Sequence, residues 1–134
     1  MISFPSNILF FYLLLSAFNP YNFIFQVHAY DCEVTLINGS TNQVLTAHCQ
    51  SNGTDVGTTT LDPAGTGSFL TPVAGDKRSV ASCDMTLGNL HGHFDVFDSD
   101  IYRSACAVRA LSWRVDESGL YVFLDQQWSL KYHW

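Results

Sequence analysis

Hydrophobic and polar side chains alternate with a period of two along most of the chain. In the segment 32–37, Cys32, Val34 and Leu36 alternate with polar residues, and later segments repeat the pattern. Such alternation is typical of half-buried β-strands, and no convincing helical period follows residue 29. Nine strands are therefore predicted, with turn residues between them: 32–37, 44–51, 58–61, 69–73, 79–87, 93–97, 111–115, 120–124 and 128–134.

The predicted strands indicate how the core is built. As a hairpin, 32–37 and 44–51 would place six side chains on one apolar face: Cys32, Val34, Leu36, Leu45, Ala47 and Cys49. The segment 120–124 is apolar at every position, which predicts a central strand covered on both faces. The segment 128–134 alternates again, which predicts that its larger side chains share one face: Trp128, Leu130, Tyr132 and Trp134.

Short strands separated by turn signals predict an all-β fold, either a β-sandwich or a small barrel. We expect a small antiparallel β-sandwich. Large aromatic side chains dominate small cores, so Trp113, Phe94 and Trp134 are expected to be buried. Residues 98–105 contain acidic side chains and no strand pattern, and we expect an acidic loop there, with Cys106 at its far end.

The first 29 residues have the pattern of a secretory signal peptide. An apolar core at 8–15 precedes Val27-His28-Ala29, which supplies small or aliphatic residues at the −3 and −1 positions of a cleavage site. A membrane anchor is the alternative, but Asn19-Pro20 interrupts the apolar run and no basic stop-transfer cluster follows. We therefore expect cleavage after Ala29, leaving one secreted domain, 30–134, that does not insert into membranes.

Charge and cysteine content narrow the choice of partner and compartment. All charged residues lie beyond residue 29, with 12 acidic against 6 basic side chains and a net charge of −6. Nucleic acids and anionic membranes require basic patches, so neither is expected as a main partner.

The four cysteines also lie beyond residue 29. An even count in a small exported chain predicts two disulfides, and without a C-x-x-C pair a zinc site has little support.

A series of short motifs, in a fixed order, resembles the pattern of the plant self-incompatibility S-protein homologue family. The motifs are Val34, Asn38, Leu45, His48-Cys49-Gln50-Ser51, Asp55-Val56-Gly57, Cys83, Phe94-Asp95-Val96-Phe97, Trp113-Arg114-Val115-Asp116-Glu117-Ser118-Gly119-Leu120-Tyr121 and the terminal Trp134. Members commonly carry a cysteine just before the tryptophan, where this chain has Leu111-Ser112, and Cys32 restores an even count.

The resemblance implies a small secreted β-sandwich, here the domain 30–134, that acts as an extracellular signalling ligand. It implies a cell-surface membrane receptor as partner and no cofactor, and we expect a monomer. A secreted structural or defence-type protein without a receptor is the alternative, and a small extracellular hydrolase has less support.

Two disulfide pairings are considered. We favour Cys49–Cys83 across the sandwich core with Cys32–Cys106 tying the N-terminus to the acidic loop. Cys32–Cys49 with Cys83–Cys106 stays open, because four cysteines permit three pairings.

No catalytic or metal-binding residues are predicted. The chain has no G-x-S-x-G motif, and the strand neighbours His48 and Cys49 should point to opposite faces, which makes a poor catalytic pair. Asp116-Glu117 is expected to be a solvated turn. His91 and His93 should share one face, but zinc needs further ligands that the sequence does not supply at a recognisable spacing.

Turns and loops carry the candidate functional residues. Asn38 and Asn52 begin N-glycosylation sequons in predicted turns. Recognition is expected in three loops, because function concentrates in loops on a rigid scaffold. These are 52–55 with Asn52 and Asp55, 74–78 with Lys77 and Arg78, and 98–104 with Asp98 and Asp100. An acidic ligand of this kind should meet a partly basic receptor surface.

Overall fold

A computed structural model describes residues 30–134, except residue 109, so the expected signal peptide at 1–29 lies outside the described residues. This part of the chain contains nine strands and one helix: β1 (Tyr30–Asn38), β2 (Leu45–Ser51), β3 (Thr54–Leu61), β4 (Thr66–Val73), β5 (Val80–Leu87), β6 (Leu90–Asp98), α2 (Ser99–Val108), β7 (Leu111–Asp116), β8 (Gly119–Leu124) and β9 (Gln127–Tyr132). Each of the nine predicted strands overlaps one of these, so that prediction is confirmed.

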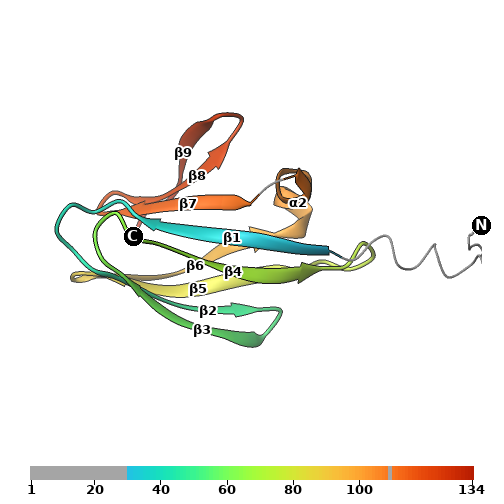
Figure 1. The fold of residues 1–134 in the computed structure, drawn as a ribbon, viewed down its shortest axis with the longest axis horizontal. Coiled ribbons are helices and arrows are strands. Elements are labelled where there is room, and N and C mark those ends of the chain that lie inside the picture. Colours follow the sequence, from blue (N-terminus) through green and yellow to red (C-terminus); the bar gives the residue numbers. More distant parts are fainter. Residues whose placement is uncertain (1–29, 109) are drawn as a thin grey trace, which may run out of the picture.

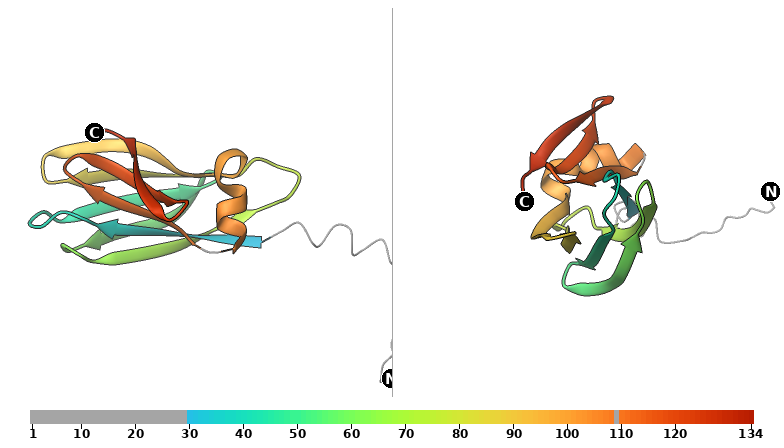
Figure 2. Two further views of the ribbon diagram at one scale, coloured as in Figure 1. Left: turned by 90° about the horizontal axis from the view of Figure 1, so that it is seen from above. Right: turned by 90° about the vertical axis from the view of Figure 1, so that its left-hand side faces the viewer.

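The strands form two sheets that pack face to face (Figure 1, Figure 2). Sheet A has the order β4-β1-β7-β8-β9 and sheet B the order β3-β2-β5-β6. This arrangement confirms the β-sandwich. Neighbouring strands run antiparallel, as expected, except β1 and β7, which are parallel. A parallel pair is possible because the chain between β1 and β7 is long enough for a crossover.

The predicted hairpin of the first two strands is wrong. β1 pairs with β4 and β7, whereas β2 pairs with β3 and β5 in the other sheet. The six side chains expected on one face are nevertheless buried, at 0–3% exposure, because the two sheets press them into one core from opposite sides. Period-two alternation identifies the buried face of a strand, but it does not identify the strand's partner.

The aromatic residues divide into buried and half-buried ones. Trp113 is fully buried, and its indole Nε1–H donates to the Val96 carbonyl oxygen at 2.8 Å. Phe94 is also buried, at 7% exposure. Trp134 is only half-buried, packing edge-on against Phe94 with ring centroids 5.4 Å apart. The expectation of burial therefore holds for Trp113 and Phe94 and is wrong for Trp134.

The last two strands differ from their predicted faces. β8 lies between β7 and β9, but it is covered on one face alone: Leu120 and Val122 are buried in the core and Leu124 packs against it, while Phe123 on the other face is 38% exposed. The pairing register of β8 and β9 shifts between Leu120 and Tyr121, which leaves one extra residue on β9. A bulge of this kind reverses the faces of the residues beyond it.

The bulge separates the side chains that were expected to share a face. Tyr132 stacks on buried Trp113, with ring centroids 5.8 Å apart, whereas Leu130 is 42% exposed. Trp128 contacts Phe123 on the outer face of the sheet.

The expected acidic loop at 98–105 is instead a helix, α2. Asp98 is the last residue of β6, and its carboxylate accepts a hydrogen bond from the backbone N–H of Asp100 at 3.0 Å. Asp is a preferred helix N-cap, and this bond satisfies one of the free N–H groups of the first turn. Tyr102 and Cys106, four residues apart, are both buried, as expected for one face of a short helix.

The structure contains the disulfides Cys32–Cys106 and Cys49–Cys83, the pairing favoured from the sequence. Cys32–Cys106 joins β1 to α2. Cys49 and Cys83 are direct neighbours on β2 and β5, so this bond lies within sheet B and does not cross the sandwich as expected.

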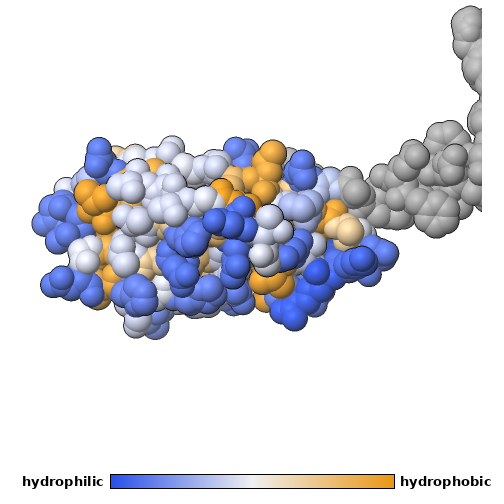
Figure 3. Space-filling model, turned by 90° about the horizontal axis from the view of Figure 1, so that it is seen from below, coloured by the Kyte–Doolittle hydropathy of each residue, from blue (hydrophilic) through white to orange (hydrophobic). Residues whose placement is uncertain are grey.

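The outer surface on the β2–β3 side is mainly hydrophilic, with hydrophobic side chains in separate patches (Figure 3). Within 30–134, residue 109 excepted, no helix is long and apolar enough to cross a membrane.

Candidate recognition surface

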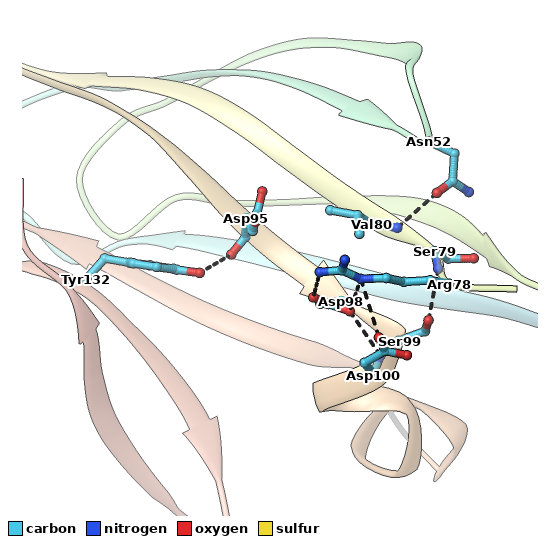
Figure 4. Close-up of polar contacts among 9 residues, drawn as sticks. All are labelled: Asn52, Arg78, Ser79, Val80, Asp95, Asp98, Ser99, Asp100 and Tyr132. Atoms are coloured by element: carbon cyan, nitrogen blue, oxygen red, sulfur yellow. Dashed lines mark hydrogen bonds and ion pairs between the residues drawn. The ribbon is translucent and has the colours of Figure 1, made fainter.

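The three segments expected to carry recognition lie at one end of the sandwich, next to α2 (Figure 1). We call this the α2 end: the β2–β3 turn at Asn52 and Gly53, the β4–β5 loop at 74–78, and the first turn of α2. Hydrogen bonds and an ion pair connect the three segments (Figure 4). The sequence did not predict this proximity, because the segments come from different strand pairs of both sheets.

The β2–β3 turn is a two-residue hairpin. Asn52 and Gly53 both have positive φ, 51° and 83°, the combination of a type I′ turn, in which Asn-Gly is the preferred pair. The Asn52 N–H donates to the Val80 carbonyl at 2.9 Å, and the Val80 N–H donates to Asn52 Oδ1 at 2.9 Å. These two bonds fix the turn against the start of β5.

An ion pair joins the β4–β5 loop to the helix. Arg78 Nη2 lies 2.6 Å from Asp98 Oδ2 and Nε lies 3.2 Å from Oδ1, and Asp100 Oδ2 is 3.5 Å from Nε. The Asp98 side chain is only 8% exposed. The hydrogen bonds from Arg78 hold the pKa of the Asp98 carboxyl below its ordinary value of 3.8, although burial acts in the opposite direction. The positive charge of Arg78 is therefore used to join the β4–β5 loop to the start of α2.

Further bonds hold the loop in place. The Ser99 N–H donates to the Ser79 carbonyl and the Ser79 N–H donates to Ser99 Oγ, both at 2.9 Å. Arg103 reaches back from α2 to the carbonyl oxygens of Ala74 and Lys77, at 3.4 and 3.5 Å. The segment 98–104 is therefore largely helical rather than a loop, and hydrogen bonds attach the 74–78 loop to α2.

Several charged side chains remain exposed in or near this end, among them Asp76 beside Lys77 on the β4–β5 loop. Lys77 lies on the loop, and the Asp100 side chain is 65% exposed. Asp55 stands apart on β3, where its Oδ1 accepts hydrogen bonds from the Gly57 N–H at 2.8 Å and is 3.0 Å from His48 Nε2. The bond from Gly57, and then that from His48, lower the pKa of Asp55. The surface thus presents the exposed Lys77 together with several exposed carboxylates.

Histidines and carboxylates also alternate across the outer face of sheet B. His48 on β2 is opposite Asp84 on β5, and Asp84 is opposite His93 on β6, with His93 Nδ1 2.7 Å from Asp84 Oδ1. His91 is exposed on the same strand as His93. Among the described residues, no group of three or more His, Cys, Asp or Glu is arranged to hold a metal ion. His48 is exposed and Cys49 is buried in a disulfide, so the two do point to opposite faces.

The two glycosylation sequons lie in different environments. Asn38 is 1% exposed, and its amide donates to the Gln43 and Leu61 carbonyl oxygens at 2.8 and 2.9 Å, so the folded chain has no accessible acceptor there. The expectation of an accessible side chain in a turn is wrong for Asn38, and its burial argues against a glycan there. Asn52 is exposed and uses only its carbonyl oxygen in the bond to Val80. Glycosylation of Asn52 stays a prediction.

Comparison with known protein families gives one match. The model of a family described as plant self-incompatibility protein S1 matches residues 33–134, which include every described strand except the first residues of β1. No curated protein matches the chain significantly.

Proposed function

The chain belongs to the plant self-incompatibility protein S1 family, and from this membership we propose that it is a secreted signalling ligand that a cell-surface receptor perceives. The observation that carries the proposal is the α2 end, where polar contacts bring together segments that are distant in sequence (Figure 4). Its segments are already fixed by hydrogen bonds, so binding a partner would cost little conformational entropy. We propose no catalytic residue and no cofactor.

Secretion is the first element of the proposal. We propose that the signal peptide is removed after Ala29, so that the mature protein begins at Tyr30. Two disulfides support an oxidising compartment. Amino-terminal sequencing of the protein from culture medium should begin Tyr30-Asp31-Cys32, and an intact, membrane-embedded Met1 terminus would contradict secretion.

Receptor binding is the second element, and charge variants test it. Lys77 and Asp100 are exposed at the α2 end, whereas Lys131 and Asp62 are exposed on other parts of the sandwich. Saturable binding of labelled protein to receptor-bearing cells should weaken in Lys77→Glu and Asp100→Asn. The matched controls Lys131→Glu and Asp62→Asn should bind as the parent does. Because the protein is acidic, binding should also depend on salt through the association rate.

The alternatives give different results. A structural or defence-type protein without a receptor would show no saturable binding to any cell type. A recognition surface elsewhere would be indicated if the control substitutions weakened binding and those at the α2 end did not. Hydrolysis of a glycan or peptide that a single His or Asp substitution abolished would favour an enzyme.

A further inference from the structure

The outer face of β7, β8 and β9 carries a cluster of exposed aromatic and aliphatic side chains. Tyr121 is opposite Leu130 and Phe123 is opposite Trp128 in the pairing of β8 with β9. Phe123 is 38% exposed and Leu130 is 42% exposed, and the rings of Phe123 and Trp128 are in contact, with centroids 5.1 Å apart. Together with Arg114 of β7, we call these residues the aromatic platform.

Arg114 lies at the centre of the platform and interacts with two rings. Its guanidinium carbon is 4.6 Å from the centroid of Tyr121 and 5.4 Å from that of Trp128, within range of cation–π attraction. Its aliphatic stem passes over Gly39, where a Cβ would come within 2.8 Å of Arg114 Cγ. The two rings and the glycine therefore hold the guanidinium in one position.

The N–H groups of this guanidinium have no acceptor among the described residues. Neither an ion pair nor a side-chain hydrogen bond of Arg114 is present there, in contrast to Arg78, which is paired with Asp98. A planar guanidinium with stacked faces keeps its N–H edge available, and that edge matches a carboxylate with two parallel hydrogen bonds. A positioned guanidinium whose N–H edge is available can bind an external anion at short range.

A hollow adjoins the platform at Phe123. It has a volume of about 600 Å³ and lies between α2 and the β8–β9 turn, lined among others by Ile101, Leu111, Asp125 and Gln126. Asp125 and Gln126 add hydroxyl-binding side chains beside the apolar surface. The platform and the hollow thus combine ring faces, a cation and polar groups on one side of the molecule.

We propose that the aromatic platform binds an acidic carbohydrate, a polymer of uronic acid. A pyranose ring has a face of C–H groups that packs on an aromatic ring and a rim of hydroxyls that needs polar partners. A uronic acid adds a carboxylate, to which the Arg114 guanidinium donates hydrogen bonds while the sugar ring lies on Trp128 or Phe123. The platform lies on other strands than the α2 end, although the hollow beside it reaches Ile101 of α2, and the proposal does not rest on the proposed receptor.

An acidic peptide is the competing occupant, and the edge of the sheet disfavours it. A peptide that added a strand beside β9 would need a regular row of backbone groups. The extra residue at Lys131 interrupts that row, and bulges of this kind are a common protection of sheet edges.

The test measures binding of the oxidised mature protein, 30–134, to three probes at one salt concentration: polygalacturonate, its full methyl ester, and polyglutamate. Only polygalacturonate should bind. Arg114→Gln should weaken its affinity at least about tenfold, the usual effect of losing charged hydrogen bonds, and Arg114→Lys should restore part of it. Trp128→Ala should weaken binding with Arg114 intact. Lys77→Gln removes the same charge at the α2 end and should change affinity by less than about twofold, because exposed distant charges are screened.

Each other outcome overturns the proposal. Equal binding of the methyl ester would show that no carboxylate is recognised, and equal binding of polyglutamate would assign the platform to acidic peptides. Unchanged affinity in a folded Arg114→Gln variant, or no binding of polygalacturonate, would exclude the site. If Arg114→Gln does not fold, NMR titration of the parent protein decides the question. The Arg114 Nε–H and Trp128 Nε1–H signals must then shift on addition of galacturonate oligomers.

Discussion

Asn38 shows at the scale of one residue how a side chain holds distant segments together. Its Oδ1 accepts the N–H of Ser40 at 2.9 Å, and its Nδ2 donates to the carbonyl oxygens of Gln43 and Leu61. All three bonds are inaccessible to solvent or nearly so, since Asn38 is 1% exposed. The sequence predicted an exposed turn here, because the bond to Leu61, on another strand, leaves no trace in the local pattern.

Replacing Asn38 by Asp should destabilise the fold. The carboxylate cannot donate to Gln43 or Leu61, and it brings a charge into a buried site, so the free energy of unfolding should fall by about 3 kcal/mol or more. Urea denaturation measures this difference. Asn42→Asp, an exposed change in the same turn, is the control and should cost less than about 0.5 kcal/mol. Similar losses in both variants would contradict the role of Asn38.

Trp113 and Trp134 should respond unequally to truncation to alanine. Trp113→Ala empties a fully buried site and breaks the bond to Val96, which should lower the free energy of unfolding by about 3–5 kcal/mol. Trp134 is half-buried and donates to the Asp116 carbonyl at 2.7 Å, so Trp134→Ala should cost about 1–2 kcal/mol. Chemical denaturation of both variants checks the order, and equal losses would mean that Trp134 is part of the core.

At the scale of elements, the positions of the strands could be predicted from the sequence, but the partner and register of each strand could not. Hydrophobic patterning and turn residues located all nine strands, most of which bury one face. They missed the parallel pairing of β1 with β7 and the bulge near Lys131, since both depend on neighbours far along the chain. They also missed α2, for which the signals were an N-cap aspartate, Asp98, and the spacing of Tyr102 and Cys106. The carboxylates led to the expectation of a loop.

Two turns of the same kind have very different sequences. Asn52-Gly53 is the preferred pair for two positive φ values, whereas Asp125-Gln126 adopts φ of 53° and 68° without glycine. Gln126→Gly should therefore raise the free energy of unfolding by about 1 kcal/mol, because glycine adopts positive φ without a Cβ penalty. Gly53→Gln in the other turn should lower it by a similar amount. Thermal unfolding of both variants measures the effect, and a destabilised Gln126→Gly variant would show that the glutamine side chain is needed for packing.

The pair of Arg78 and Asp98 predicts how stability depends on pH. Because Arg78 lowers the pKa of Asp98 in the folded protein, the pair stabilises the fold above the ordinary carboxyl pKa of about 4. This contribution is lost as pH falls through the lowered folded-state pKa. Asn is also a good N-cap, so Asp98→Asn removes mainly the charge. The variant should be less stable than the parent near pH ~6, and the difference should shrink towards pH ~2.

Urea denaturation across this pH range tests the prediction. Asp76→Asn removes an exposed carboxylate from the same loop and is the control. A stability difference for Asp98→Asn that stays constant with pH would contradict the role of the charge.

At the scale of the whole molecule, the two disulfides join different parts of the fold. Cys49–Cys83 joins neighbouring strands of sheet B, whereas Cys32–Cys106 fastens α2 to β1. The sequence separations are 34 and 74 residues, and closing either loop should contribute about 4 kcal/mol in the chain-entropy model. The sequence could only favour this pairing, because alternation does not show which strands are adjacent.

Removing each disulfide by paired Cys→Ser changes should therefore separate global from local effects. Both variants should lose stability, but only Cys32→Ser with Cys106→Ser should loosen α2 and the 74–78 loop, because of the two disulfides only this one reaches the helix. Hydrogen exchange should then show faster exchange at the α2 end in this variant than in Cys49→Ser with Cys83→Ser. Peptide mapping under non-reducing conditions should recover the two pairs intact, and a peptide joining Cys32 to Cys49 would contradict the assignment.

The parallel pairing of β1 with β7 has a consequence for synthesis. Every strand of sheet B is complete once the ribosome has added residue 98, but sheet A still consists of β1 and β4 alone. Until β7 emerges, β1 keeps a free edge that can pair with the edge of another chain. A nascent or prematurely terminated chain that stops before Leu111 is therefore the form of this protein most prone to aggregation, and chaperones should have to cover it in that interval.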